Sequence, residues 1–124
     1  MEKNNIYDKS YAFAIRVVKG HQFLSREKRE FIISKQLLRS GTSIGANVAE
    51  ANGAISRSDF SLKISIAYKE ALETKYWLKL LSDTGFINSK VLGSMHDDAD
   101  ELCRILFSIL KTTSINNKQK IVYC

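Results

Sequence analysis

The chain of 124 residues is long enough for one domain with one hydrophobic core, and its hydrophobic content of 44% and charged content of 26% are ordinary globular values. It carries 19 basic and 13 acidic residues, and the resulting net charge of +6 favours contact with an anionic polymer or surface. No apolar run reaches membrane-spanning length and no signal-type segment opens the chain, so the sequence predicts a soluble, cytoplasmic protein.

The first predicted helix spans residues 5–23 and carries two apolar lines. The line that we assign to the core contains Tyr7, Tyr11, Ala14, Ile15 and Val18 at helical spacing. The line on the opposite side contains Ile6, Phe13, Val17 and Leu24. An exposed face should be charged, so we interpret this second line as a face buried between subunits. A few tolerated apolar groups on the surface are the alternative.

The second predicted helix spans residues 26–52, with Ser25 as its N-cap and Gly53 as its C-terminal stop. Small residues recur at every fourth position, namely Gly41, Gly45, Ala49 and Gly53, and they form a strip with almost no side-chain bulk along one side of this helix. Each interior glycine costs a helix about 1 kcal/mol against alanine. Two such glycines in one helix therefore predict close approach by the backbone of a neighbouring helix.

The third predicted helix spans residues 56–83, with Ser56 as its N-cap. Its core line contains Phe60, Ile64, Ala67, Ala71, Thr74, Leu78 and Leu81. A second apolar line contains Leu62, Ile66, Trp77 and Leu80, which would be a costly surface patch on a monomer. Asn88 or Ser89 caps the fourth helix, which runs to Lys111. Residues 1–112 thus form one domain, and the polar residues 113–124 are predicted to be a flexible tail.

Four helices with short loops predict an all-α fold, an antiparallel up-down-up-down four-helix bundle. The first and third helices lie diagonally in such a bundle, and each carries a second apolar face. Two different faces on opposite sides of a subunit favour a head-to-tail contact, which closes into a ring or continues as a filament. We therefore expect a cyclic homo-oligomer, with a twofold dimer as the alternative.

Catalytic and metal-binding patterns are absent from the sequence. Glu50, Glu70 and Glu73 resemble a carboxylate metal pair, but bundle sites of that kind need a histidine three residues after a glutamate, and none stands there. We expect no enzymatic activity, no cofactor and no metal. Structural hydrogen bonds or ion pairs to the third helix or to another subunit are predicted for Asn47, Glu50, Glu70 and Glu73, with Arg39 or Lys69 as candidate charge partners.

Basic residues are concentrated in the first half of the chain, where residues 1–57 carry ten basic and five acidic side chains. The candidates for nucleic-acid binding are Arg16, Lys19, Arg26, Lys28, Arg29, Lys35 and Arg39. Contacts to phosphates dominate the affinity of such surfaces. We find no aromatic side chains interleaved among these residues, so we predict recognition of the backbone or of shape rather than of bases. Charge that serves only solubility is the alternative.

The segment from Leu38 to Ala51 resembles the signature of four-helix-bundle proteins encoded in intervening sequences of bacterial 23S rRNA genes. The third helix is similar to that family at Ser58-Asp59-Phe60, Ile66-Ala67, Glu70-Ala71 and Glu73-Thr74. Gly45 departs from the family pattern, which often has proline at this position. The departure concerns the exact course of the second helix and not the fold. The accessory variability protein of diversity-generating retroelements resembles the same family.

The resemblance implies an antiparallel four-helix bundle that assembles as a homopentamer around a central channel, without enzymatic activity. The likeness to the retroelement relative further implies contact with nucleic acid and with a reverse transcriptase through a basic surface. We therefore predict a non-enzymatic homopentameric interaction protein that binds the backbone of RNA or DNA through its basic surface. A protein-binding scaffold without nucleic-acid contact is the alternative.

Overall fold

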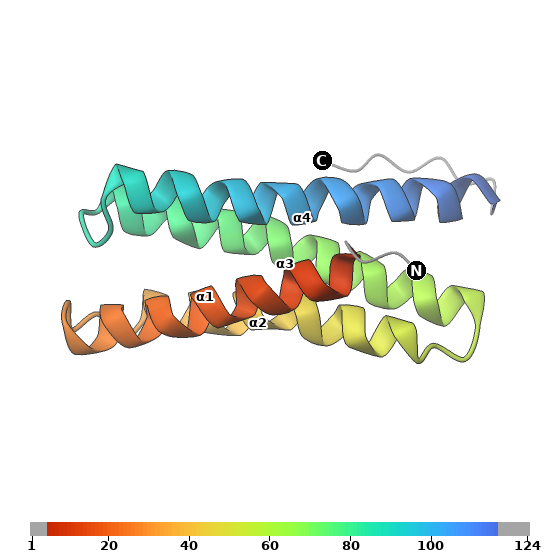
Figure 1. Cartoon of the computed structure of the whole chain (residues 1–124), viewed down its shortest axis with the longest axis horizontal. Coiled ribbons are helices and arrows are strands. Elements are labelled where there is room, and N and C mark those ends of the chain that lie inside the picture. Colours follow the sequence, from red (N-terminus) through yellow and green to blue (C-terminus); the bar gives the residue numbers. More distant parts are fainter. Residues whose placement is uncertain (1–4, 117–124) are drawn as a thin grey trace.

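Four helices run alternately up and down the long axis of the molecule (Figure 1). The computed structural model describes the backbone of residues 5–116 and the side chains of residues 5–113. The helices are α1 (Ile6–Arg26), α2 (Ile33–Asn52), α3 (Arg57–Asp83) and α4 (Ser89–Asn116). The predicted all-α up-down bundle is therefore confirmed. The helix α4 continues into the predicted tail as far as Asn116, and residues 117–124 of that tail lie outside the described residues.

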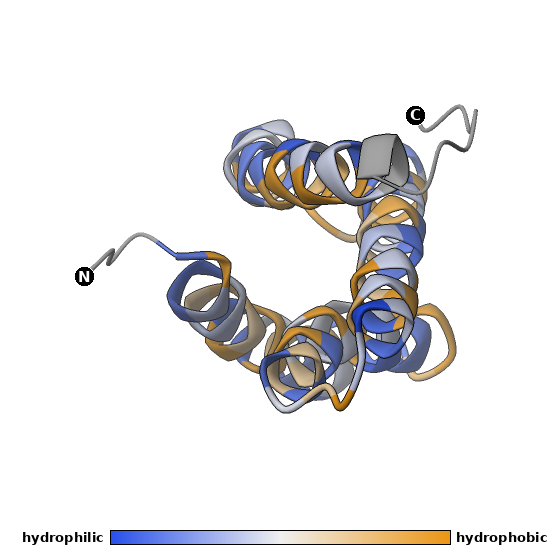
Figure 2. Ribbon diagram, turned by 90° about the vertical axis from the view of Figure 1, so that its right-hand side faces the viewer, coloured by the Kyte–Doolittle hydropathy of each residue, from blue (hydrophilic) through white to orange (hydrophobic). Residues whose placement is uncertain are grey.

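Each helix packs along its neighbour in the sequence, whereas α1 and α4 meet over a shorter stretch. Seen end-on, the four ribbons trace an open C, with α1 and α4 at its two ends (Figure 2). Two ion pairs join α1 to α4, one between Lys9 Nζ and Glu101 Oε2 at 3.0 Å and one between Arg16 Nη1 and Asp98 Oδ2 at 2.7 Å. Two ion pairs therefore bridge the side on which α1 and α4 meet.

Two of the predicted helix caps are confirmed. The Ser56 hydroxyl accepts a hydrogen bond from the Asp59 amide at 3.0 Å, and Asn88 Oδ1 accepts one from the Val91 amide at 2.8 Å. Gly85 follows α3 with φ +87°, a backbone conformation that a residue with a Cβ adopts only under strain. The two caps could be predicted from the sequence because each cap side chain accepts a hydrogen bond from an amide in the first turn of its own helix.

The predicted start of the second helix was wrong. Ser25 lies inside α1, where its hydroxyl donates to the His21 carbonyl at 2.8 Å, and α2 begins at Ile33. The Glu30 carboxylate caps α2 by accepting hydrogen bonds from the amides of Ile32, Ile33 and Ser34, at 3.2, 2.9 and 2.6 Å. A carboxylate suits this position because the free amides of a helix start carry partial positive charge.

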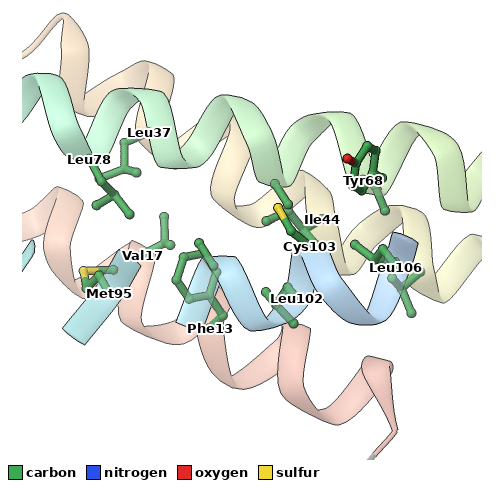
Figure 3. Close-up of a cluster of buried hydrophobic side chains, with 14 of the residues drawn as sticks. Phe13, Val17, Leu37, Ile44, Tyr68, Leu78, Met95, Leu102, Cys103 and Leu106 are labelled. Atoms are coloured by element: carbon green, nitrogen blue, oxygen red, sulfur yellow. The ribbon is translucent and has the colours of Figure 1, made fainter. Parts of the chain in front are cut away.

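Side chains from all four helices meet in one core (Figure 3). The core line predicted for α3 is buried, apart from the half-buried Phe60. The two faces of α1, however, were assigned the wrong way round. Phe13, Val17 and Leu24, expected at a subunit contact, are buried inside the chain. The line expected in the core is exposed at Tyr7, Tyr11, Ile15 and Val18, and half-buried at Ala14.

The glycines of α2 explain which face of α1 is buried. A Cβ built on Gly41 would lie 2.7 Å from Val17 Cγ2 and 2.8 Å from Val17 Cγ1, and one on Gly45 would lie 3.3 Å from Ser10 Oγ. The predicted close approach by the backbone of a neighbouring helix is confirmed at Gly45, whose Cβ would also lie 3.4 Å from the Ser10 carbonyl oxygen, whereas at Gly41 the Val17 side chain takes the space. Ala49 and Gly53, at the far end of the strip, are exposed and take no part in it.

We expect Gly41→Ala to destabilise the protein although alanine is the better helix former. Overpacking against the buried Val17 costs about 1–3 kcal/mol, which outweighs a propensity gain of about 1 kcal/mol. Gly93→Ala is the matched control, because nothing lies within 4 Å of a Cβ at that position, and it should gain about 0.5–1 kcal/mol. Urea unfolding measures both. Equal stability of the two variants would contradict the steric account, and Val17→Ala should relieve part of the loss in Gly41→Ala.

A second prediction concerns pH. Partial burial opposes ionisation of Glu30, but the hydrogen bonds from Ile33, Ser34 and Ile32 outweigh it and hold the pKa of Glu30 below its ordinary value. The stabilisation by this carboxylate is therefore fully present above the ordinary pKa and is lost as the pH falls through the lowered one. Glu30→Ala should lose about 1 kcal/mol at pH 7, as for other helix caps.

The deficit of Glu30→Ala, measured by urea unfolding, should narrow as the pH is lowered to about 3, because the wild-type carboxylate then becomes protonated. The exposed neighbour Glu27 supplies the control, since the Glu27→Ala variant removes the same charge from the same connection without removing a cap. A deficit that stays constant from pH 7 to pH 3 would sink the charge-based explanation.

Candidate nucleic-acid interface

The structure gathers five of the seven predicted basic residues at one end of the bundle. These residues, which we call the basic end, are Lys19, Arg26, Lys28, Arg29 and Lys35. They lie on the last turns of α1, on the connection of residues 27–32 and on the first turn of α2, at the orange end in Figure 1. All five are exposed, and none pairs with a carboxylate of residues 5–113.

The other two predicted residues, Arg16 and Arg39, are engaged in ion pairs between helices. Arg16 contacts Asp98 of α4, and Arg39 of α2 contacts Glu70 at 3.1 Å and also Glu73, both of α3. A side chain that already bridges two helices is less available to a phosphate. No local pattern distinguishes these two residues from the other five, because their partners lie on other helices.

Three of the four predicted structural polar residues connect α2 with α3. Glu70 and Glu73 pair with Arg39, and Glu73 also accepts a hydrogen bond from the Trp77 indole at 2.9 Å. The hydrogen bond from the Arg39 guanidinium and, as the next largest cause, the hydrogen bond from the Trp77 indole hold the pKa of Glu73 below its ordinary value. Glu50 pairs with Lys63 at 2.8 Å, a partner that sequence reasoning missed.

Asn47, the fourth of these residues, bonds within its own helix rather than across to α3. Its amide donates to the Ser43 carbonyl at 2.9 Å and to the Ser43 hydroxyl at 3.0 Å. Of the two candidate charge partners, Arg39 takes the role and Lys69 is exposed. Ion pairs thus connect α2 with α3, and Arg39 is the cation that contacts two carboxylates of α3.

Exposed aromatic side chains are interleaved with the basic end, so the prediction that there are none was wrong. Phe23 is 46% exposed and Phe31 is 51% exposed. The Lys28 ammonium lies 6.0 Å from the centre of the Phe23 ring, and Arg29 Cζ lies 5.8 Å from that of Phe31. The signal was in the sequence, because the two phenylalanines flank the basic run. Exposed rings among cations are typical of surfaces that bind single strands.

The start of α2 is not free to bind a phosphate itself. Glu30 already accepts hydrogen bonds from three of its first amides, and its charge offsets the positive end of the helix dipole. An anion at this end of the molecule therefore has to be bound by side chains. Lys28 and Arg29 of the connection and Lys35 of the first turn of α2 are the exposed cations nearest in sequence to the capped helix start.

The apolar residues predicted to lie at a subunit contact are only partly on the surface. On α3, Leu62 is 56% exposed, while Ile66, Trp77 and Leu80 are half-buried. On α1, Ile6 is half-buried and the other three candidates belong to the core. The exposed apolar line of α1 is instead the one that contains Tyr7 and Tyr11, whose rings stack with their centres 6.1 Å apart.

No three or more histidine, cysteine, aspartate or glutamate side chains of the described residues are grouped so that they could hold a metal ion. None of the helices within residues 5–116 combines the length and apolar character needed to cross a membrane.

Comparison with known proteins places the chain in a family. Among solved structures it resembles a protein of unknown function from the S23 ribosomal protein family of Bacteroides thetaiotaomicron, with 50% identity over 86% of this chain and 99% of that chain and a TM-score of 0.85. No curated protein matches it. The family model described as 23S rRNA-intervening sequence protein matches residues 2–108. The chain therefore belongs to the 23S rRNA-intervening sequence protein family.

Proposed function

We propose that this protein is a non-enzymatic, self-associating protein that binds the backbone of RNA or DNA through its basic end. The observation that carries the proposal is the group of five exposed cations without carboxylate partners at one end of the bundle. Elsewhere in the described chain, cations such as Arg39, Lys63 and Lys75 are engaged with carboxylates. Arg57, Lys69, Lys90 and Lys111 also pair with no carboxylate of the described residues, but they are spread along α3 and α4, whereas the five cations of the basic end lie together.

Phosphate binding by such a group has a quantitative signature. Each neutralised phosphate releases counterions, so the affinity falls steeply as the salt concentration rises. For about five contacts we expect a loss of roughly 10²- to 10³-fold between 50 and 200 mM salt. Self-association strengthens the effect, because a pentamer would carry a net charge of about +30 and hold five basic ends on one particle.

Self-association is supported by exposed apolar side chains on two different helices. On α1 the line that contains Tyr11 is exposed, and on α3 Leu62 is exposed while the rest of its line is half-buried. Exposed apolar surface of this kind is costly on a monomer. Two different faces favour a head-to-tail ring. The family resemblance implies five subunits, so we propose a cyclic homopentamer.

The same apolar surface favours one alternative, a scaffold that binds proteins without touching nucleic acid. In that case the exposed rings of Tyr7 and Tyr11 would contact a partner protein, since aromatic side chains are enriched in the cores of interfaces. A reverse transcriptase is one such partner by family resemblance. The two functions differ in whether the basic end contributes to binding.

Charge reversal at the basic end tests the proposal. The triple variant Arg26→Glu, Lys28→Glu and Arg29→Glu should bind labelled structured RNA and duplex DNA about tenfold to a hundredfold more weakly at 100 mM salt and should show a shallower salt dependence. Fluorescence polarisation across a salt series measures both. The matched control reverses three exposed cations elsewhere, Arg57, Lys69 and Lys111.

The control triple makes the same change in net charge, so an equal loss in both variants would mean that binding depends on total charge rather than on the basic end. Absence of binding by the intact oligomer at low salt would refute the nucleic-acid function and leave the scaffold. The oligomeric mass is measured in the same buffer, so that loss of binding is not confused with loss of assembly.

The ring proposal makes a separate prediction. Light scattering should give about 70 kDa for five copies of the 14.1 kDa chain. Tyr11→Glu and Leu62→Glu, at positions 57% and 56% exposed, should each dissociate the ring without unfolding the helices. Ile55→Glu, at a position 91% exposed in the α2–α3 connection, is the control and should leave the mass unchanged.

A head-to-tail contact joins two different faces, so each of the two variants keeps one intact face. An equimolar mixture of the Tyr11→Glu and Leu62→Glu proteins should therefore form one-to-one dimers through the two undamaged faces. A twofold contact, in which each face pairs with itself, would not give this result. Monomers in the mixture would argue against the head-to-tail arrangement.

A further inference from the structure

A cavity of about 830 Å³ opens beside the basic end, between the second half of α1 and the α3–α4 connection. Gly20 and Phe23 of α1, Lys28 of the first connection and Phe86 of the last are among its lining residues. The volume lies within the range of about 300–1,000 Å³ that is usual for small-molecule sites. Two other hollows in the described chain are smaller, at about 350 and 160 Å³.

The charged side chains that line this cavity are all cations. They are Arg16, Lys19 and Lys28, and no carboxylate of the described residues is part of the lining. Arg16 is held by Asp98 at 2.7 Å, whereas Lys19 and Lys28 pair with no carboxylate of the described chain. A ligand of this cavity therefore gains from carrying negative charge at the rim.

The rest of the lining is mainly apolar and partly aromatic. Leu24, Leu78 and Leu81 are fully buried core residues that form part of the wall. The exposed ring of Phe23 and the half-buried ring of Phe86 contribute from two different elements. A flat aromatic group attached to an anion matches this combination, because aromatic rings prefer to stack on one another.

We propose that this cavity receives an unpaired nucleotide of the strand that the basic end binds. The base lies against the phenylalanine rings of the cavity, and Lys19 and Lys28 contact the flanking phosphates. This inference rests on the proposed function, since the two lysines belong to both surfaces. It adds a substrate class, namely single-stranded or locally unpaired nucleic acid, because the bases of a duplex are stacked on each other and cannot enter.

Two glycines of the chain provide a matched test. Gly20 lines the cavity, Gly93 lies outside it on α4, and a Cβ built on either meets no atom within 4 Å. Gly20→Leu therefore adds a side chain that should narrow the cavity, from a Cβ position that meets no neighbour, and Gly93→Leu makes the same change at an exposed position outside the cavity. Leucine is a better helix former than glycine, so both variants are expected to fold. Phe23→Leu, which keeps apolar bulk and removes one ring, is the second variant.

The measurement is the ratio of the affinities for a single-stranded RNA and for the blunt duplex of the same sequence, by fluorescence polarisation at one salt concentration. The wild type should favour the single strand by about fivefold to a hundredfold, the range expected for stacking of one base. Gly20→Leu should reduce the affinity for the single strand by about tenfold and leave that for the duplex unchanged. Phe23→Leu should act in the same direction, and Gly93→Leu should resemble the wild type.

A ratio that stays at the wild-type value in Gly20→Leu and Phe23→Leu would overturn the cavity inference and leave backbone binding by the basic end intact. Binding to neither RNA at low salt would instead overturn the proposed function, and this inference with it. The triple charge reversal includes Lys28 of the cavity rim and should weaken the binding of single strand and duplex alike, whereas Gly20→Leu changes only the cavity.

Discussion

The close approach of α1 to the glycines of α2 is the constraint on which the rest of the molecule depends. Val17 fills the space that Gly41 leaves open, and this contact fixes the rotation of α1 about its own axis. Because side chains recur every 3.6 residues, one fixed contact determines where every other residue of the helix points. It sends Phe13 and Leu24 into the core and leaves the line of Tyr7 and Tyr11 exposed.

The same rotation arranges the charges of α1. Arg16, one residue before Val17, reaches Asp98 on α4, while Lys19 lies exposed at the rim of the cavity. Ion pairs on a surface contribute only about 0–1 kcal/mol each, so these bridges matter less for stability than for where the remaining charge lies. Of the cations that pair with no carboxylate of the described residues, five lie together at the basic end, whereas Arg57, Lys69, Lys90 and Lys111 are spread along α3 and α4.

Glu30 has an unexpected part in this arrangement. The carboxylate sits within the most basic stretch of the chain, yet it is turned back onto the first amides of α2. Its charge is therefore used to cap a helix rather than to neutralise the neighbouring cations, and Arg29, whose φ of +53° places it in the left-handed region, remains exposed beside it. The connection of residues 27–32 holds two glutamates and two cations, so the excess positive charge of this end comes from Lys19, Arg26 and Lys35 on the flanking helices.

The sequence by itself determined the helical class, the core line of α3, the caps at Ser56 and Asn88, and the need for close packing at Gly41. Each of these depends on residues within one helix or one turn, where spacing and local hydrogen bonding are sufficient. The membership of the family was likewise readable from the segment of residues 38–73, because that signature is local and specific.

Tertiary structure alone decided which face of α1 is buried, where α2 begins and which cations have partners. Helical periodicity allowed either of two apolar lines on α1 to face inward, and only contact with α2 selected the one that contains Val17. Ser25 has the residue type of a helix cap, but α1 continues through it, and the cap comes from Glu30. Arg39 differs from Arg29 only because carboxylates of α3 lie beside it, a proximity between distant segments that no local pattern encodes.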